Sequence, residues 1–206
     1  MKNTARFRHF VAEFTRLIET NGTDEKAMHE SGGRLLGELV KHDDWLPEEA
    51  TQPHPQFYQQ YLLYCDPLER FSVVSFVWGP GQKTPVHDHT VWGLVGMMRG
   101  AETCRRFAHT QPGQPMHAGK AERLLPGQVD RVSPTVGDIH EVANALSDRS
   151  SISIHVYGAN IGAVKRHVFD PATGADKPFV SGYSSTQMPN FWDRSAEVRA
   201  TITAAA

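Results

Sequence analysis

The feature that most constrains the fold is a run of short β-prone segments that begins at Tyr58 and continues to about Ser184. The segments are rich in Val, Ile, Phe and Tyr, and turns that contain Gly or Pro separate them. Many short strands with such spacing are typical of an antiparallel sandwich or a small barrel. The stretch 109–120 is predicted to be a loop. The candidate strands are 58–65, 71–78, 84–89, 92–99, 102–108, 121–125, 128–132, 139–144, 150–157 and 163–169.

The part of the chain before this run is predicted to be helical. Apolar residues recur at steps of three and four over residues 5–20 and again over 27–40, which is the period of a helix with one buried face. The predicted fold class is therefore mainly β, a small antiparallel barrel with N-terminal α-helices. The length favours one domain over residues 1–206, with a helical part at 1–45 and a β-barrel at 58–184.

The composition excludes several kinds of partner. The chain has 21 Lys and Arg against 23 Asp and Glu, a formal charge of −2, and no basic block that could neutralise a phosphate backbone. Charged residues recur through the first forty positions, so neither a signal peptide nor a membrane span is expected. The two cysteines, Cys65 and Cys104, stand far apart, and a disulfide is not expected. We therefore expect a cytoplasmic protein that binds neither nucleic acid nor a membrane.

A pair of histidines, His87 and His89, lies on one predicted strand. Alternate side chains of a strand share a face, so both imidazoles can reach one metal ion. His140 follows on a later strand, which a closed sheet could bring opposite the pair. An isolated His-x-His pair is more often an exposed or hydrogen-bonded feature, because histidine is common at surfaces. Here the context favours a metal site, since both segments match the paired motifs of cupins, each with a preceding glycine.

The acidic ligand that cupins usually place shortly after the second histidine is missing, and Gly93 stands there. Three neutral imidazoles leave the full charge of a metal ion uncompensated, which favours an anionic ligand such as a thiolate. Nitrogen ligands with open positions suit Fe(II) and its oxygen chemistry, although zinc, nickel and copper also accept them. One Fe(II) per chain is the predicted cofactor.

The segment 151–157 alternates strictly between apolar and polar side chains. Its polar face carries Ser153, His155 and Tyr157, which can form a hydrogen-bonded relay if that face points into a barrel. The alternative is an exposed edge strand with its polar face in water.

With these residues the chain resembles the cysteine dioxygenase family of cupin thiol dioxygenases, from about Tyr58 to Phe169. The resemblance implies iron ligation by His87, His89 and His140. It also implies that Tyr157 presents its hydroxyl to substrate and oxygen, and that His155 and Ser153 hold the tyrosine.

Two departures resemble a glutamine-type bacterial branch similar to 3-mercaptopropionate dioxygenases. The animal enzymes carry an arginine for the substrate carboxylate where this chain has Gln60. They also carry a cysteine after the histidine pair that cross-links to the tyrosine, and this chain lacks it. Arg166 is then a candidate cation for the substrate carboxylate, and its alternative is an ordinary surface arginine in the charged run 165–167.

The predicted function is oxidation of a small mercapto-carboxylic acid by O2 to its sulfinate, with 3-mercaptopropionate favoured and L-cysteine as the alternative substrate. No external reductant is needed, and no Gly-x-Gly-x-x-Gly fingerprint of a nucleotide cofactor is present. Two other classes stay open, a non-catalytic metal-binding cupin and a zinc-dependent isomerase. Trp78, Trp92 and Met97 are predicted to fill the barrel and not to line the pocket.

Overall fold

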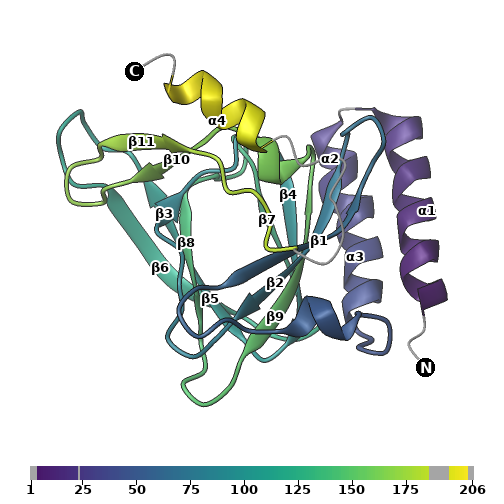
Figure 1. The fold of residues 1–206 in the computed structure, drawn as a ribbon. Helices are drawn as coiled ribbons and strands as arrows, with labels where there is room; N and C mark the ends of the chain where they lie inside the picture. The colour runs from purple at the N-terminus through teal and green to yellow at the C-terminus, as the bar shows by residue number, and fades with distance from the viewer. Residues whose placement is uncertain (1–3, 23, 186–194, 204–206) are drawn as a thin grey trace.

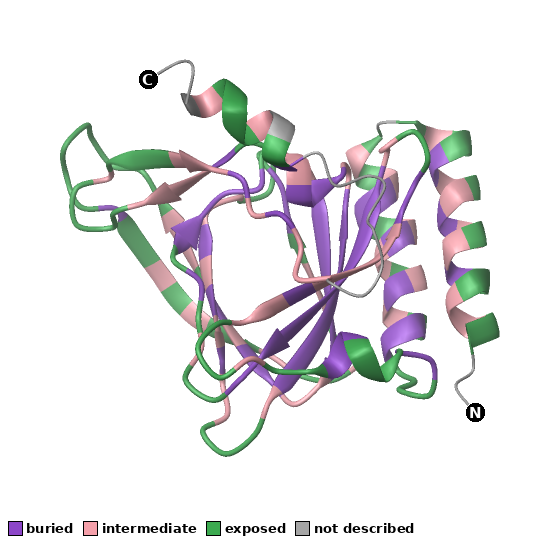
Figure 2. Ribbon diagram, in the orientation of Figure 1, coloured by how far each residue is buried: buried purple, intermediate pink, exposed green. Residues whose placement is uncertain are grey.

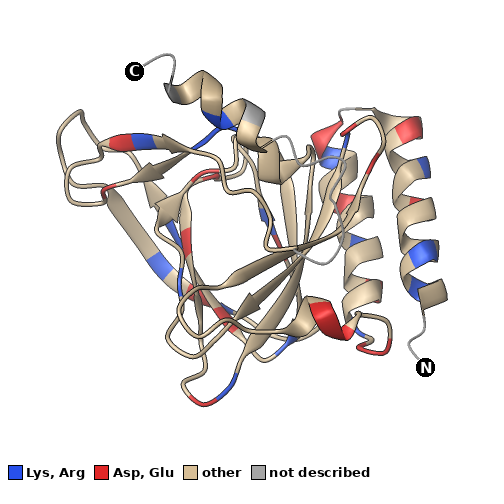
Figure 3. Cartoon of the chain, in the orientation of Figure 1, with Lys and Arg blue, Asp and Glu red and all other residues tan. Residues whose placement is uncertain are grey.

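The protein was studied as a computed structural model, which describes residues 4–22, 24–185 and 195–203. Two antiparallel β-sheets face each other, and helices cover the outer face of one of them (Figure 1). The predicted fold class, mainly β with N-terminal helices, is confirmed. Within the described ranges no helix is long and apolar enough to cross a membrane. Acidic and basic residues are interspersed over the elements (Figure 3).

The N-terminal helices form an amphipathic layer. Helix α1 spans Thr4–Asn21, and a second helical segment runs as α2 (Glu25–Ala27), a π-helical turn η1 (Met28–Gly32) and α3 (Gly33–Val40). Asp24 begins the second segment, because its carboxylate accepts hydrogen bonds from the free backbone N–H groups of the first turn. Short 3₁₀ turns follow later at η2 (Glu48–Thr51) and η3 (Ile161–Ala163), and α4 spans Ser195–Thr203.

The two sheets differ in how they are covered. The five-stranded sheet packs under the helices, and its three central strands are buried along most of their length (Figure 2). Its order is β1 (Gln59–Cys65), β2 (Ser72–Trp78), β9 (Ser151–Tyr157), β4 (Gly93–Arg99) and β7 (Val129–Val132). The order of the six-stranded sheet is β11 (Asp176–Phe179), β10 (Arg166–Phe169), β3 (Val86–His87), β8 (His140–Asn144), β5 (Glu102–Ala108) and β6 (His117–Leu124).

Strand β9 separates two regions of the core. Ile152, Ile154 and Val156 pack with α1 and α3 in the larger cluster, which also contains Phe14 and Leu36. The other face of β9 points between the sheets, where a smaller cluster includes Tyr157, Phe76 and Trp78. Because β9 pairs with β2 on one side and β4 on the other, the edge-strand alternative for 151–157 is wrong.

Three details of the predicted elements are corrected. The predicted strand 84–89 is reduced to two residues in β3, because the residues before Val86 pair with β8 only through an isolated bridge between Lys83 and Ala143. The predicted loop 109–120 ends earlier, since β6 begins at His117 and pairs with β5. Strand β11 was not predicted from its sequence Asp-Lys-Pro-Phe, which has little β-propensity and is formed by pairing with β10.

Candidate metal centre

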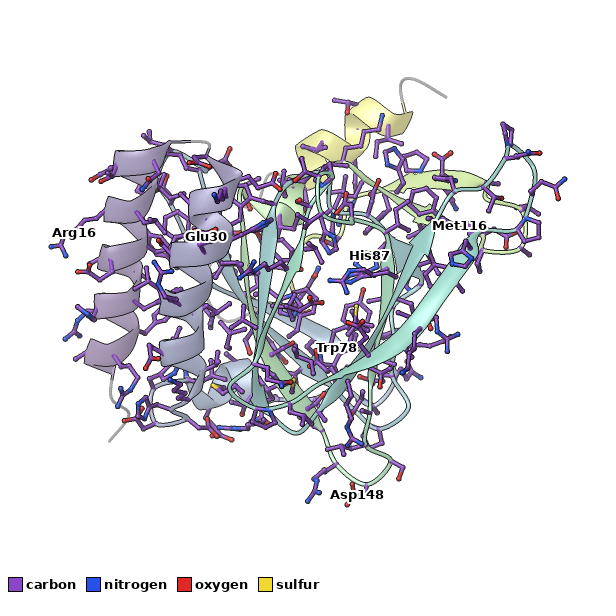
Figure 4. The ribbon with its side chains drawn as sticks, turned by 180° about the vertical axis from the view of Figure 1, so that it is seen from behind. Arg16, Glu30, Trp78, His87, Met116 and Asp148 are labelled. Atoms are coloured by element: carbon purple, nitrogen blue, oxygen red, sulfur yellow. The ribbon has the colours of Figure 1, made fainter. Side chains whose placement is uncertain are left out.

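Three histidines meet between the two sheets. His87 lies on β3, His89 follows it, and His140 opens β8, directly opposite His87 in the antiparallel register. One potential ligand nitrogen from each ring lies within 4.8 Å of the others, and the ring centroids are 4.8 to 4.9 Å apart. Figure 4 shows His87 projecting into the space between the sheets. The structure thus brings the three predicted ligands together.

The second nitrogen of each ring is already occupied, which orients the rings. Nδ1 of His87 is 3.1 Å from the carbonyl oxygen of Pro85, and Nδ1 of His89 is 3.0 Å from a carboxylate oxygen of Asp138. Nδ1 of His140 is 3.3 Å from Sγ of Cys104. With Nδ1 engaged at all three rings, Nε2 is the nitrogen left for a metal, and such outer partners are the usual way in which ligating imidazoles are held.

Asp138 has a larger role than its place in the sequence indicated. Its carboxylate also accepts hydrogen bonds from the backbone N–H groups of His89 and Thr90. Thr90 has φ +61°, a left-handed conformation that threonine rarely adopts. Asp138 therefore fixes both the ring of His89 and the strained turn that follows it.

Burial keeps the three imidazoles neutral. Their residues are 8%, 1% and 3% exposed for His87, His89 and His140. Loss of hydration lowers the pKa of His87 to about 4, and it lowers the pKa of His89 and of His140 well below the ordinary value. Neutral imidazoles with free Nε2 atoms are the form that binds a metal ion. Among the described residues, this group of potential ligands contains no carboxylate.

The polar face of β9 forms a buried relay beside the histidines. The hydroxyl of Ser153 is 2.8 Å from Nε2 of His155, and Nδ1 of His155 is 2.8 Å from the hydroxyl of Tyr157. The ring of Phe76 stacks on His155 with centroids 4.1 Å apart. Burial lowers the pKa of His155 to about 3, so this ring is a neutral link in the relay. Burial likewise raises the pKa of Tyr157 well above its ordinary value, so its hydroxyl keeps its proton.

Gly93 explains how the ring of Tyr157 fits next to the three histidines. The two residues are paired across β4 and β9. A Cβ atom at position 93 would come within 2.8 Å of the Tyr157 ring and equally close to Val132. A side chain here would displace the tyrosine, so glycine leaves room for the ring, which stacks on His89 at 5.4 Å.

A pocket opens onto the histidines and the relay. Its polar lining includes His87, His140, His155, Tyr157, Gln60 and Arg166, and its apolar lining includes Phe76, Trp78 and Phe179. Trp78 is thus a pocket residue, and the prediction that it only fills the barrel is wrong. Trp92, by contrast, packs with the helical core cluster, and Met97 is fully buried.

The two predicted substrate contacts both reach this pocket. Gln60 Nε2 donates to the carbonyl oxygen of Gly182 at 2.5 Å, which fixes the amide. Arg166 is 5% exposed, so its alternative as a surface residue is wrong. Its guanidinium donates to Ser181 Oγ and lies 4.7 Å above the ring of Phe179, but its Nε has no partner among the described residues. Buried donors on a charged group are normally paired, so a buried guanidinium whose Nε–H lacks a partner in a pocket favours an anionic ligand.

The donor set fits a metal ion. Three neutral imidazoles converge, each is oriented through its Nδ1, and no acidic ligand of the described chain accompanies them. Barrel and site together define a β-barrel protein with a buried three-histidine metal centre. The model of the family "Cysteine dioxygenase type I" matches residues 68–170, half of the chain. The chain belongs to this family, and family and site together imply a bound metal.

Two mammalian proteins show how closely this chain is related to its relatives. Cysteine dioxygenase type 1 of Bos taurus is 25% identical over 118 residues, which cover 56% of this chain and 58% of the bovine protein. The Homo sapiens protein is 27% identical over 107 residues, which cover 51% and 52%. The chain therefore spans only a little over half the length of these relatives.

Solved structures with related barrels are more distant. A protein with a double-stranded β-helix domain from Klebsiella pneumoniae has 18% identity and a TM-score of 0.44, covering 59% of this chain and 95% of that one. A cupin superfamily protein from Desulfitobacterium hafniense has 13% identity and a TM-score of 0.42, covering 58% and 94%.

Proposed function

We propose that the protein is a non-haem Fe(II) thiol dioxygenase that oxidises a small mercapto-carboxylic acid, preferentially 3-mercaptopropionate, to its sulfinate. The observation that carries the proposal is the group of three neutral histidines, two of which line a pocket together with Tyr157 and with Arg166, whose Nε has no partner among the described residues. His87, His89 and His140 are assigned as the iron ligands. The family membership supports the same chemistry.

The reaction adds both atoms of O2 to the sulfur of the thiolate, so the substrate supplies all the electrons and one proton is released from the thiol. Bound to three neutral imidazoles, Fe(II) would supply a cationic site for the thiolate and the one-electron chemistry that dioxygen requires. The absence of an acidic donor from the histidine group favours an anionic substrate at that site.

Arg166 is assigned to the substrate carboxylate. A guanidinium remains charged in a protein and pairs with a carboxylate through two parallel hydrogen bonds. Arg166 lines the pocket, and its Nε–H, which has no partner among the described residues, supplies a donor. Phe179 and Ser181 hold the guanidinium in place. The protein would thereby hold both ends of a short substrate, the thiolate at the metal and the carboxylate at Arg166.

Tyr157 and the relay are assigned to the reacting end of the substrate. Tyr157 lines the pocket together with His87 and His140, and its hydroxyl is hydrogen-bonded to His155, which in turn contacts Ser153. A hydroxyl held in this way needs no reorganisation to hydrogen-bond to oxygen or substrate during the reaction.

The preference for 3-mercaptopropionate over cysteine rests on charge. Cysteine carries an α-ammonium group, which needs an acceptor or a carboxylate when it is buried. Among the residues that the structure describes, the pocket lining includes no Asp or Glu, and the cation Arg166 is part of it. Gln60 offers only a neutral amide, part of which is engaged with Gly182. A substrate without the ammonium group fits this lining better.

The test combines metal analysis with oxygen uptake. Iron-loaded protein is supplied with 3-mercaptopropionate, L-cysteine or cysteamine, and sulfinate is identified by mass spectrometry. We expect oxygen uptake with a kcat/KM for 3-mercaptopropionate well above that for cysteine. A preference for cysteine would overturn the substrate assignment. Zinc in the native protein, or no uptake with any thiol, would overturn the dioxygenase assignment in favour of an isomerase or a non-catalytic metal-binding protein.

A further inference from the structure

A short segment after β11 crosses from one sheet to the other beside the pocket. Residues 180–185, here called the strap, leave the edge strand of the six-stranded sheet and run along β1, an edge strand of the five-stranded sheet (Figure 1). The backbone N–H of Ser184 donates to the carbonyl oxygen of Gln60 at 2.8 Å, and the backbone N–H of Gln60 donates to Ser184 Oγ at 3.1 Å. The backbone N–H of Leu62 donates to Ser185 Oγ at 3.1 Å. The strap thus satisfies backbone groups that an edge strand otherwise leaves open.

The strap also holds the side chains of the two predicted substrate contacts. Gln60 Nε2 donates to the carbonyl oxygen of Gly182 at 2.5 Å, and Arg166 Nη2 donates to Ser181 Oγ at 2.8 Å. Gln60 lies on β1 and Arg166 on β10, which belong to different sheets and do not pair with each other. Two consecutive residues of the strap therefore join side chains from both sheets, and the relative position of these side chains depends on the strap.

The conformation of the strap is fixed at Gly182. Its φ of +69° lies in the left-handed region that favours glycine, and its N–H donates to the carbonyl oxygen of Gly162 at 2.9 Å. A Cβ atom at this position would come within 2.9 Å of Arg199 Nη2. Arg199 itself donates to the carbonyl oxygen of Val180, so α4 holds the beginning of the strap.

Tyr183 anchors the strap to the segment that follows β9. Its hydroxyl donates to Asn160 Oδ1 at 2.6 Å and accepts the backbone N–H of Gly162 at 2.9 Å. Its ring lies against the backbone of Gly162, where a Cβ atom would come within 2.3 Å of the ring. The strap is thus attached along its whole length, so it can keep the side chains that it holds in one arrangement.

A guanidinium that is already fixed binds a carboxylate better than a mobile one. Ordering a flexible side chain when a ligand binds reduces the affinity, and a side chain ordered in advance avoids this cost. Arg166 is 5% exposed and is held by Ser181 through Nη2, while its Nε–H has no partner among the described residues. Ser181 therefore occupies one donor of the guanidinium and leaves another for a ligand in the pocket that Arg166 lines.

We propose that Ser181 is a positioning residue that fixes the guanidinium of Arg166 and thereby sets the length of the mercapto-carboxylic acid that the pocket selects. The proposal rests on the proposed function for the identity of this ligand. A thiolate at the histidines and a carboxylate at Arg166 must be separated by the distance that the strap imposes. Ser181 acts on binding through Arg166 and has no contact with the reacting atoms. Loss of its hydroxyl should therefore weaken both the affinity for the acid and the selection by length.

The first test measures binding without turnover, on protein loaded with zinc in place of iron. Titration calorimetry gives Kd for 3-mercaptopropionate, for 2-mercaptoacetate, which is one methylene shorter, and for 2-mercaptoethanol, which has no carboxylate. In Ser181→Ala we expect about tenfold weaker binding of 3-mercaptopropionate, as for the loss of a hydrogen bond to a charged group. The ratio of the Kd values of the two acids should move toward one, and the Kd of 2-mercaptoethanol should not change.

Two further variants show whether the hydroxyl of Ser181 is the cause. Ser181→Thr keeps the hydroxyl and should restore the native Kd for 3-mercaptopropionate. Ser147→Ala removes the hydroxyl of an exposed serine and is the matched control, so all three Kd values should stay native. Equal weakening of all three thiols in Ser181→Ala would indicate a purely structural role and would overturn the proposal, as would a native Kd with a native ratio.

The second test follows the strap itself by hydrogen exchange. The backbone amides of Gly182 and Ser184 are bonded to carbonyl oxygens, so their exchange reports opening of the strap. Because Ser181 couples the strap to Arg166, binding of 3-mercaptopropionate should slow this exchange in the native protein and not in Arg166→Met. Binding that leaves the exchange of the native protein unchanged would contradict the coupling.

Oxygen uptake by the iron-loaded protein separates this proposal from the proposed function. If Ser181→Ala weakens binding as expected and the native protein consumes no oxygen, the dioxygenase function alone is contradicted. If the native protein consumes oxygen and Ser181→Ala keeps the native Kd and ratio, the role of Ser181 alone is contradicted. Native protein that binds none of the three thiols would contradict both.

Discussion

At the scale of single residues, the sequence was most informative where potential metal ligands also follow the alternation of a β-strand. His87 and His89 could be placed on one face because the side chains of an extended segment alternate, and His140 could be added from its motif. Asp138 and Cys104 were not identified, since their contacts with Nδ1 of the histidines depend on how loops and strands meet in space. Glu102 was missed for the same reason, because β5 reaches Ser151 only through the closure of the barrel.

Metal ligands and relay residues should respond differently to truncation. His140→Ala removes one of the three proposed ligands, and we expect it to abolish stable metal binding. His155→Ala leaves Tyr157 without its orienting partner, so metal content should stay near the native value while kcat falls about 10²-fold, the usual loss for one preorganised donor. Metal analysis and oxygen uptake on the same samples make the comparison. Equal metal loss in both variants would place His155 among the ligands.

Arg166 should act on substrates according to their charge. Arg166→Met removes the buried guanidinium, so KM for 3-mercaptopropionate should rise about 10²-fold, as expected when one partner of a buried charge pair is lost. The KM of a thiol without a carboxylate, such as 2-mercaptoethanol, should change little. Arg105→Met, at an exposed position of β5, is the control and should leave both values unchanged. A similar KM increase for both thiols would contradict carboxylate binding.

At the scale of elements, β9 connects the structural and the functional sides of the protein. Its apolar face holds the helices on the sheet, and its polar face carries the relay, so the pattern that predicted a strand also placed the relay residues. Short or weakly apolar elements were predicted less well. Strand β11 exists through its pairing with β10, and β3 is short because His89 and Thr90 turn toward Asp138.

The helical layer should contribute to stability without contacting the metal site. Phe14 of α1 is fully buried, and its ring lies 5.0 Å from that of Phe71 and 6.1 Å from that of Trp92. Phe14→Ala should lower the free energy of unfolding by about 3 to 5 kcal/mol, measured by urea denaturation. Phe57→Ala, at a residue 63% exposed, should change it by less than about 0.5 kcal/mol. Folded Phe14→Ala that loses its metal would show coupling between the two regions.

At the scale of the whole molecule, the mainly β class and the helical beginning followed from composition and periodicity. The order of strands in the two sheets did not, because it depends on contacts between segments far apart in the chain. That the chain forms one domain over 1–206 stays a prediction.

The free energy of unfolding of the whole protein should depend on pH through the protonation of Glu102. The pKa of this group is raised to about 8 in the folded protein, so the folded state binds its proton more tightly than the unfolded state. Its favourable contribution is complete below pH 4.5 and is lost as pH rises toward 8. The free energy of unfolding of Glu102→Gln minus that of the native protein should therefore increase as the pH rises through this range. Urea unfolding of the metal-free proteins measures both values. A difference that does not change with pH would contradict the buried carboxylic acid.

The backbone of Gly93 against the ring of Tyr157 bears on how such a protein can evolve. An acidic ligand at this place would begin with a Cβ atom that the tyrosine and Val132 already exclude. A lineage that gains such a ligand must first shift β4, β7 or the tyrosine itself. A single substitution at position 93 is therefore expected to give an inactive protein, and a carboxylate can be added to the site only together with changes in the neighbouring strands.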